Sequence, residues 1–410
     1  MYVRVVDERV GTVRAGCDAD RCCLAARGRP AAPPRQPGWP VSGLRRVVAA
    51  ALVVGSWGVG AACDRPSGHA GGELQRLDAY DAVLGAMDDH PLVALGEMHL
   101  SQQYHDFLQA LLVRPELPDK IDDIVVEFGN GLYQDVADRF LLDLEAVSYV
   151  ELAQIWRNTI GGRTYWDAPV YEQFFRTVHA VNRALPAPDR IRVLLGDPAV
   201  DLAEIRGAAD RDLLPAPGER DTFYAEVVER EVLARGRHAL LIAGADHTRR
   251  GEATNDNPRQ GNLGTLLSRA HPDALFVIDP LPFNPRDSED AHERIETDLA
   301  SWPIPSVALV EGTWLAAQPM DFRALEPDLT FGDQVDAVLW VGPESTLTAS
   351  QADPELYRTG DYADELARRS AVFSEIESQP IDLVAEGLAL STAPPGLHDG
   401  RDALGELYAD

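Results

Sequence analysis

The chain has 410 residues, of which 45% are hydrophobic, and it carries a formal net charge of −29 at neutral pH. This apolar fraction is enough for a sizeable core in one large or two modest domains. A chain this acidic repels nucleic acid and anionic lipid, so its composition argues against a nucleic-acid partner. We therefore expect a globular protein that acts on a small molecule or a peptide.

All four cysteines lie near the N-terminus, at Cys17, Cys22, Cys23 and Cys63. The remainder of the chain can therefore hold neither a disulfide nor a thiolate metal site.

The segment before Cys63 has the composition of a secretory signal. Two arginines, Arg45 and Arg46, precede an apolar run over residues 47–62 that closes with two alanines. Basic residues, a short apolar stretch and small residues in this order are typical of an export signal, and the run is too short for a transmembrane helix. We predict a signal segment at residues 41–62 and export to the cell envelope.

A cysteine directly after two alanines resembles a bacterial lipobox, which implies that Cys63 is lipidated and anchors the protein to a membrane. A secreted protein without lipid and an uncleaved anchor are the alternatives. Residues 1–40 are rich in Arg, Pro and Gly and are interpreted as disordered or as an over-extended translation start. Residues 63–75 are interpreted as a tether.

Strands and helices are predicted to alternate along the rest of the chain. Seven short runs rich in Val, Ile and Leu indicate buried strands at residues 92–96, 124–128, 191–196, 239–244, 274–278, 306–310 and 337–341. Helical spacing occupies residues 102–113, 132–144, 170–185, 220–235 and 261–270. This alternation predicts an α/β fold with a mainly parallel sheet of about six or seven strands, flanked by helices.

No Pro/Gly/Ser-rich linker divides this region. We therefore predict one α/β catalytic or ligand-binding domain over residues 76–345. A helical insertion is expected at about 145–169, where it could form a lid. Residues 346–410 form a predicted C-terminal helical segment, in which 363–386 are expected to pack on the outside of the sheet.

Ionisable residues follow the first five predicted strands. In chain order they are Glu97 and His99, then Glu127, Asp197, the pair Asp246 and His247, and Asp279. Side chains at the carboxyl ends of parallel strands converge on one crevice. Two of these segments share a Gly-x-x-His pattern, in which the glycine is expected to let the chain turn sharply as it leaves the strand.

Glu97 and Glu127 are the strongest candidates, because a carboxylate at the end of an apolar strand is costly unless it is paired or bound to a cation. With His99 and His247 they could bind a divalent ion such as Zn or Mn and leave a position for water, whose pKa the ion would lower. Without a metal, His99 oriented by a carboxylate would deprotonate water directly. The spacing leaves both mechanisms open.

Other candidates have competing structural interpretations. Asp197 and Asp279 each precede a proline, and Asp246 lies in a turn, so helix caps or turns compete with substrate contacts. Arg157 and Arg163 in the insertion are candidates for binding an anionic substrate group, against ordinary salt bridges.

The sequence argues against several enzyme classes. It has no Gly-x-Ser-x-Gly elbow and no cysteine after Cys63, which disfavours a covalent Ser or Cys hydrolase. It has neither a Gly-x-x-x-x-Gly-Lys loop nor a dinucleotide-binding fingerprint.

The motifs around Glu97, His99, Glu127 and His247 resemble the superfamily that joins erythromycin esterases, ChaN-type haem-binding lipoproteins and the Tiki and TraB proteins. The resemblance extends over residues 92–247 as scattered motifs. The Tiki and TraB branch implies a metal for peptide cleavage, held by the paired Gly-x-x-His motifs and a glutamate. The esterase branch implies that the first histidine is a general base, and the ChaN branch implies haem binding.

The chain departs from the esterase motif at Met98 and Leu100, where a small residue and a glycine are usual, so macrolide specificity is not implied. The resemblance implies an exported hydrolase that cleaves an ester or amide through Glu97, His99, Glu127 and His247. The alternative is a haem- or metal-binding lipoprotein without catalysis. A third interpretation is a scaffold that keeps these motifs for structure alone.

Overall fold

The computed structural model describes residues 71–160, 164–254, 257–281, 289–319, 324–325 and 329–407. The predicted signal segment, Cys63 and Arg163 lie outside these residues. Among the helices that are described, none is long and apolar enough to cross a membrane.

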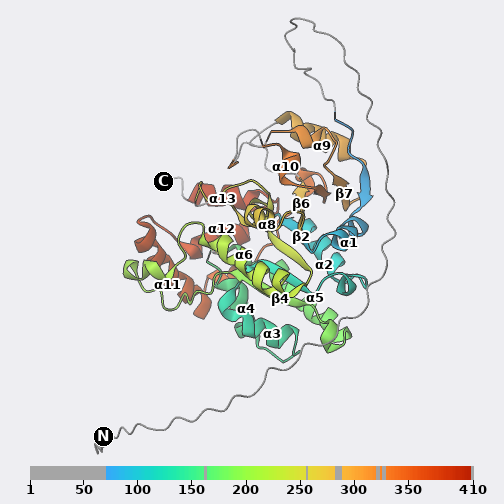
Figure 1. Ribbon diagram of the computed structural model, residues 1–410. Helices are drawn as coiled ribbons and strands as arrows, with labels where there is room; N and C mark the ends of the chain where they lie inside the picture. The colour runs from blue at the N-terminus through green and yellow to red at the C-terminus, as the bar shows by residue number, and fades with distance from the viewer. Residues whose placement is uncertain are drawn as a thin grey trace, which may run out of the picture. The chain divides into compact units, whose positions relative to one another are not determined.

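Eight strands form one sheet in the order β1-β7-β8-β6-β2-β5-β3-β4 (Figure 1). Their bounds are β1 Arg76–Asp78, β2 Leu92–Glu97, β3 Asp123–Asn130, β4 Arg192–Asp197, β5 Ala239–Gly244, β6 Leu275–Leu281, β7 Ser306–Leu309 and β8 Ala337–Trp340. The strands from β8 to β4 in this order pair in parallel, whereas β7 runs antiparallel to both β1 and β8.

The predicted α/β class and the mainly parallel sheet are confirmed, but the sheet has eight strands and not six or seven. Each of the seven predicted strands is present. The eighth strand, which was not predicted, is β1. Its three residues are all exposed and include only one apolar side chain. A short exposed edge strand lacks the apolar run by which buried strands are recognised.

Helices occupy the remaining connections. They are α1 Ala79–Asp89, α2 Gln102–Leu112, α3 Gln134–Leu141, α4 Tyr149–Arg157, α5 Pro169–Ala184, α6 Glu219–Glu231, α7 Ala245–Thr248, α8 Leu263–Ala270, α9 Glu289–Leu299, α10 Phe331–Gln334, α11 Asp361–Glu377, α12 Leu383–Thr392 and α13 Asp399–Leu407. Capping residues begin several of them: Ser101 accepts from the Tyr104 amide at α2, and Asn262 accepts from the Thr265 amide at α8.

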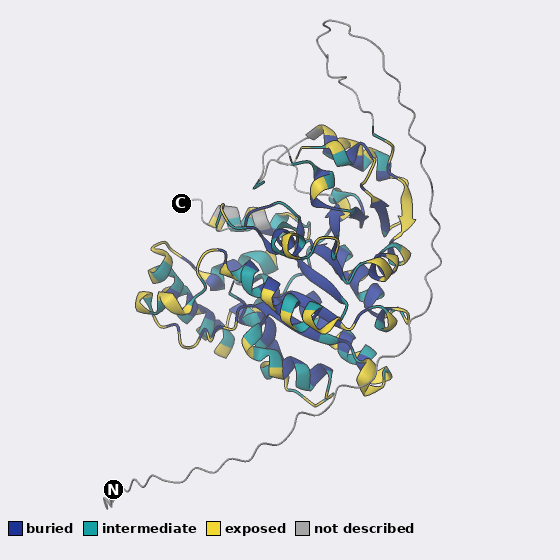
Figure 2. Cartoon of the chain, in the orientation of Figure 1, coloured by how far each residue is buried: buried dark blue, intermediate teal, exposed yellow. Residues whose placement is uncertain are grey.

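The sheet separates two apolar clusters because successive side chains of a strand point to opposite faces. In β2, Val93 and Leu95 pack with α1, α2 and α5, whereas Leu92 and Ala94 pack with α6, α8 and α9. Figure 2 shows the central strands as buried, whereas exposed residues lie mainly on the outer helices and on the edge strand β1. Burial on both faces explains why the central strands are almost wholly apolar.

The C-terminal helices pack differently from the expectation for residues 363–386. The chain breaks at Ser378, which has a left-handed φ of 56°, so that two helices replace one. Buried side chains of α11, such as Val372 and Leu366, belong to two small clusters with the segment after β4 and with α12. These helices therefore cover loops at the ends of strands rather than the main clusters on the sheet faces.

A core substitution tests this packing. Leu241 in β5 has 0% exposure, and Leu241→Ala should lower the free energy of unfolding by about 2–5 kcal/mol because it leaves a cavity between sheet and helices. Chemical denaturation measures the loss. The matched control is Leu309→Ala in β7, where the side chain is 49% exposed and the cost should be about 0.5 kcal/mol or less. Equal losses at the two positions would contradict the arrangement.

Candidate active site

The strand order places the predicted ionisable residues side by side. Strands β6, β2, β5, β3 and β4 are consecutive in the sheet and parallel. Their carboxyl ends carry Asp279, Glu97 with His99, Asp246 with His247, Glu127 and Asp197, respectively. Residues spread over 183 positions of sequence, from Glu97 to Asp279, are thereby collected at one edge of the sheet.

Glu97, the last residue of β2, is 3% exposed. Its Oε1 accepts a hydrogen bond of 2.7 Å from the Tyr171 hydroxyl and lies 3.2 Å from His105 Nε2 and 3.4 Å from His99 Nδ1. Its Oε2 is buried and, among the described residues, has no hydrogen-bond partner. Burial alone would raise the pKa of this carboxyl, but His99 and His105 outweigh burial and hold the pKa well below its usual range.

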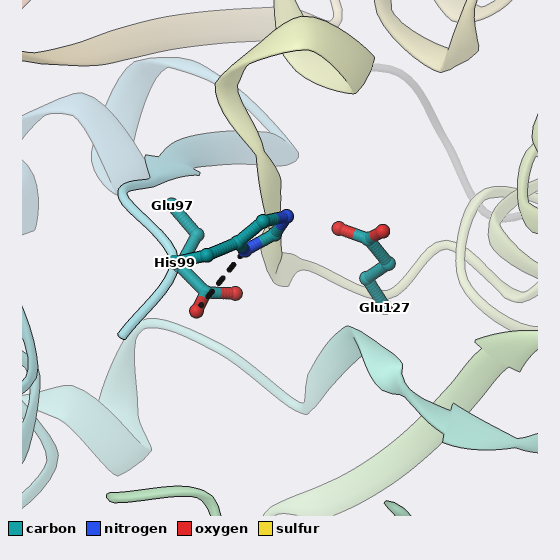
Figure 3. Close-up of side chains that lie close together, drawn as sticks. All are labelled: Glu97, His99 and Glu127. Carbon is teal, nitrogen blue, oxygen red and sulfur yellow. Dashed lines mark ion pairs between the residues drawn. The ribbon is translucent and has the colours of Figure 1, made fainter. Parts of the chain in front are cut away.

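His99 lies between two carboxylates (Figure 3). Its Nδ1 faces Glu97, and the other ring nitrogen is on the side of Glu127. The His99 ring packs edge to face against Trp166, with 4.8 Å between the ring centroids. The His99 side chain is 38% exposed. Desolvation lowers the pKa of His99, but the Glu97 carboxylate outweighs it and raises the pKa to about 9. His99 is therefore protonated at neutral pH in the absence of a ligand.

Glu127 in β3 is also 3% exposed and joins several elements. Its Oε2 accepts a 2.6 Å hydrogen bond from the Gly244 amide, and its Oε1 lies 2.9 Å from Arg220 Nη2 and 3.4 Å from His247 Nε2. Burial raises the pKa of Glu127, but His247, Arg220 and His99 outweigh it and lower the pKa to about 2. The site therefore holds two ionised carboxylates.

His247 has the same kind of support as His99. Its Nδ1 lies 2.7 Å from Asp221 Oδ1, and that oxygen also accepts a 2.9 Å hydrogen bond from the Leu263 amide. Desolvation lowers the pKa of His247, but Glu127 and Asp221 outweigh it and raise the pKa. Each histidine of the two Gly-x-x-His segments thus has a carboxylate at Nδ1. Glu127 lies near the other side of both rings, as Figure 3 shows for His99 and the 3.4 Å contact with Nε2 shows for His247.

The glycines of these motifs serve close packing, not the sharp turn expected from the sequence. Neither has a left-handed φ. A Cβ at Gly96 would lie 2.9 Å from Pro280 Cδ, and a Cβ at Gly244 would lie 3.0 Å from His99 Nε2. Small residues are required because adjacent strands and the His99 ring approach the backbone.

Three of the four predicted metal ligands meet the geometric requirement for a shared ion. One ligand atom each from Glu97, His99 and Glu127 lies within 4.8 Å of the others. The unpartnered Glu97 Oε2 supplies an oxygen donor, and an imidazole with two carboxylates suits Zn or Mn. His247 lies outside this group, where Asp221 holds it.

The predicted substrate-binding carboxylates have partners within the protein. Asp197 Oδ1 accepts from Arg220 Nε at 2.6 Å, and both oxygens of Asp279 accept from Arg249 at 3.0 Å. Both aspartates are buried. Asp246 is 45% exposed and lies 3.7 Å from Arg249.

Arg157 is likewise engaged. Its Nε donates to Asp167 at 3.1 Å, its Nη2 donates to the Tyr149 hydroxyl at 3.0 Å, and its side chain is only 13% exposed. It stabilises the insertion through these bonds.

Four residues that complete the site carried weak sequence signals. Arg220 and Asp221 lie in the first turn of α6, and charged residues are common in the first turn of helices. Tyr171 has the spacing of the apolar residues on the core face of α5. His105 in α2 is 0% exposed, and its Nε2 lies 3.2 Å from Glu97 Oε1. Only proximity in the fold reveals their connection to the two glutamates.

A glycine substitution tests the position of His99. Gly244→Ala places a methyl group 3.0 Å from His99 Nε2 and 3.4 Å from Glu127 Oε2, so we expect a folded protein with a displaced imidazole. NMR of the imidazole nitrogens should show a shifted His99 resonance, with unchanged far-UV circular dichroism. Gly85→Ala in α1, whose Cβ would meet nothing within 4 Å, is the control. An unchanged His99 resonance in Gly244→Ala would contradict this geometry.

No protein-family model and no curated protein matches the chain. Solved structures do match over much of its length. An erythromycin esterase, EreC, in its open conformation is 12% identical with a TM-score of 0.41, covering 64% of this chain and 92% of that one. A succinoglycan biosynthesis protein is 9% identical with a TM-score of 0.45, covering 66% and 94%.

The structure of ChaN of Campylobacter jejuni with cofacially bound haem also matches, at 14% identity and a TM-score of 0.33, covering 51% of this chain and 88% of that one. An erythromycin esterase and ChaN, two of the groups that the motifs resemble, are thus among the solved structures that the chain matches. Identities this low, with TM-scores below 0.5, carry no argument about what this chain binds or cleaves.

Proposed function

We propose that this protein is a hydrolase in which His99 activates water to cleave an ester or amide bond. One observation supports this proposal above the others: the His99 imidazole lies between the buried carboxylates of Glu97 and Glu127 and keeps 38% of its side chain open to solvent. A base that is oriented and still reachable is what general-base hydrolysis requires.

Glu97 is the orienting group in this proposal. Its contact with Nδ1 holds the ring and stabilises the imidazolium that forms when the other nitrogen takes a proton from water. The Tyr171 hydroxyl and His105 fix the carboxylate in turn. Glu97 therefore acts through His99.

His247 is the proton donor in this proposal. Asp221 and Glu127 raise its pKa and so favour the protonated form, and its side chain is 11% exposed. Two histidines at one site can divide the work of base and acid, with His99, the more exposed of the two, taking the proton of water and His247 returning one to the leaving group.

A divalent ion fits the same residues. Glu97, His99 and Glu127 would hold Zn or Mn, and the buried, unpartnered Glu97 Oε2 is the donor whose burial such an ion would offset. When bound, the ion would supply a Lewis acid that lowers the pKa of water.

Substitution and pH together test the base. His99→Ala should lower kcat/KM for p-nitrophenyl acetate at least about 100-fold. The wild-type rate should rise with pH up to about 9, because only neutral imidazole accepts a proton and the Glu97 carboxylate raises the pKa of His99 to about 9. Glu97→Gln removes that charge, so the pKa should fall towards its ordinary value of 6.5 and the rise should move to lower pH.

The control for this experiment is His271→Ala, because His271 is 39% exposed and pairs with Glu229 away from the site. It should retain the wild-type rate. Full activity in His99→Ala would refute the proposed mechanism.

Metal analysis and an absorption spectrum of the purified protein test the cofactor. One Zn or Mn per chain, with affinity weakened about tenfold or more in Glu127→Gln because that variant loses one of the three donors, would assign the activation of water to the ion in place of the His99 base. The same spectrum tests the alternative of haem binding. A Soret band that disappears in His99→Ala would contradict the proposed hydrolase and favour a ChaN-like haem-binding protein.

A further inference from the structure

A cavity of about 410 Å³ lies apart from the Glu97, His99 and Glu127 group. Its walls come from α4 in the insertion, from the segment after β4 and from the first half of α11. We propose that this cavity binds an organic cation, an amine carried on an apolar body, and that this body is part of the substrate. The second half of the proposal rests on the proposed hydrolase function, whereas binding of the amine does not.

Two hydrogen bonds connect the cavity to the candidate active site. Asn158 lines the cavity, and its carbonyl accepts a 2.8 Å hydrogen bond from the side chain of Asn130, three residues beyond Glu127 in β3. The Ile160 amide donates to Asp197, which in turn holds the Arg220 side chain that pairs with Glu127. The cavity therefore belongs to the same edge of the sheet as the two glutamates.

The cations that line the cavity are already neutralised. Arg157 donates to Asp167 and lies over the Tyr362 ring, 4.2 Å from its centroid. Arg369 donates to Glu365 and to the Arg157 carbonyl, each at 2.8 Å, and also to the Asn158 side chain. An anionic ligand would find no unpaired guanidinium on these walls and would have to break an existing bond.

The cavity also presents two carboxylates that form no ion pair. Asp201, in the segment after β4, accepts a 2.9 Å hydrogen bond from the Ala203 amide. Neither Asp201 nor Asp361, at the start of α11, has a cationic partner within 4 Å among the described residues. Both side chains are exposed. A ligand that carries an ammonium group would complement them, while a carboxylate would be repelled.

The rest of the lining suits an apolar body with an oxygen acceptor. Val150, Leu202 and the ring of Tyr133 contribute apolar surface. The Tyr133 hydroxyl accepts a 2.7 Å hydrogen bond from Asn158 Nδ2, which leaves its own proton to donate to a ligand oxygen. A mostly apolar cavity with a few polar groups that fix orientation is typical of small-molecule sites.

Calorimetry with three probes that share one ring system tests the proposal: 2-naphthylmethylamine, 2-naphthalenemethanol and 2-naphthoate. We expect the amine to bind with a Kd at least about tenfold lower than that of the alcohol. This ratio corresponds to a difference of about 1.4 kcal/mol in binding free energy at 25 °C. The carboxylate should bind more weakly than the alcohol. Asp201→Asn and Asp361→Asn should each weaken amine binding, and the difference between amine and alcohol should vanish in the double variant.

Two further variants separate the cavity from the general acidity of the protein. Asp364→Asn removes the same charge from an exposed position of α11 that does not line the cavity, and it should leave amine binding unchanged. Val150→Trp, at a side chain that is 73% exposed, should fill the cavity mouth without disturbing the fold and abolish binding of the amine. Equal affinity for amine and alcohol, or binding that survives Val150→Trp, would overturn the proposal.

Hydrolysis provides the second readout. The amine should inhibit cleavage of p-nitrophenyl acetate in the wild type and not in Val150→Trp, and binding without inhibition would refute its place in the substrate site. If the protein hydrolyses nothing, the calorimetric result still decides whether the cavity binds the amine, so that failure of the cavity and failure of the hydrolase can be told apart.

Discussion

The buried carboxylate of Glu127 is the constraint around which the site is arranged. A charge with 3% exposure is costly to remove from water. Three groups offset this cost: the Gly244 amide, the Arg220 guanidinium and the His247 ring. They come from the end of β5, the start of α6 and α7. Satisfying one carboxylate therefore fixes how these elements meet at the edge of the sheet.

The same requirement spreads outward from Glu127. Arg220, whose side chain is 20% exposed, pairs with a second anion, Asp197 at the end of β4, and His247 is held at its other nitrogen by Asp221. In the network that results, each of these charged groups lies next to a group of opposite charge. His99 is the exception, since it combines a buried carboxylate on one side with a side chain that is 38% exposed, and this combination is the physical basis of its proposed role.

The insertion and the C-terminal helices reach the site through another buried carboxylate. Asp167 accepts from Arg157 and from the hydroxyls of Tyr357 and Tyr362, which belong to the C-terminal segment. The neighbouring Trp166 packs against His99 at 4.8 Å. The C-terminal helices thus help to position the environment of His99 and, with the insertion, form the walls of the proposed cation-binding cavity.

The sequence by itself determined the α/β class, the seven buried strands and the gathering of Glu97, His99 and Glu127, because apolar runs report burial and the carboxyl ends of parallel strands meet at one edge. It missed β1, which is not buried. Only the tertiary structure decided that Asp197, Asp279 and Arg157 are engaged in internal ion pairs and that His247 lies outside the group of three possible ligands. Local periodicity shows which side chains are buried but not which partner neutralises them, and that partner is brought close only by the fold.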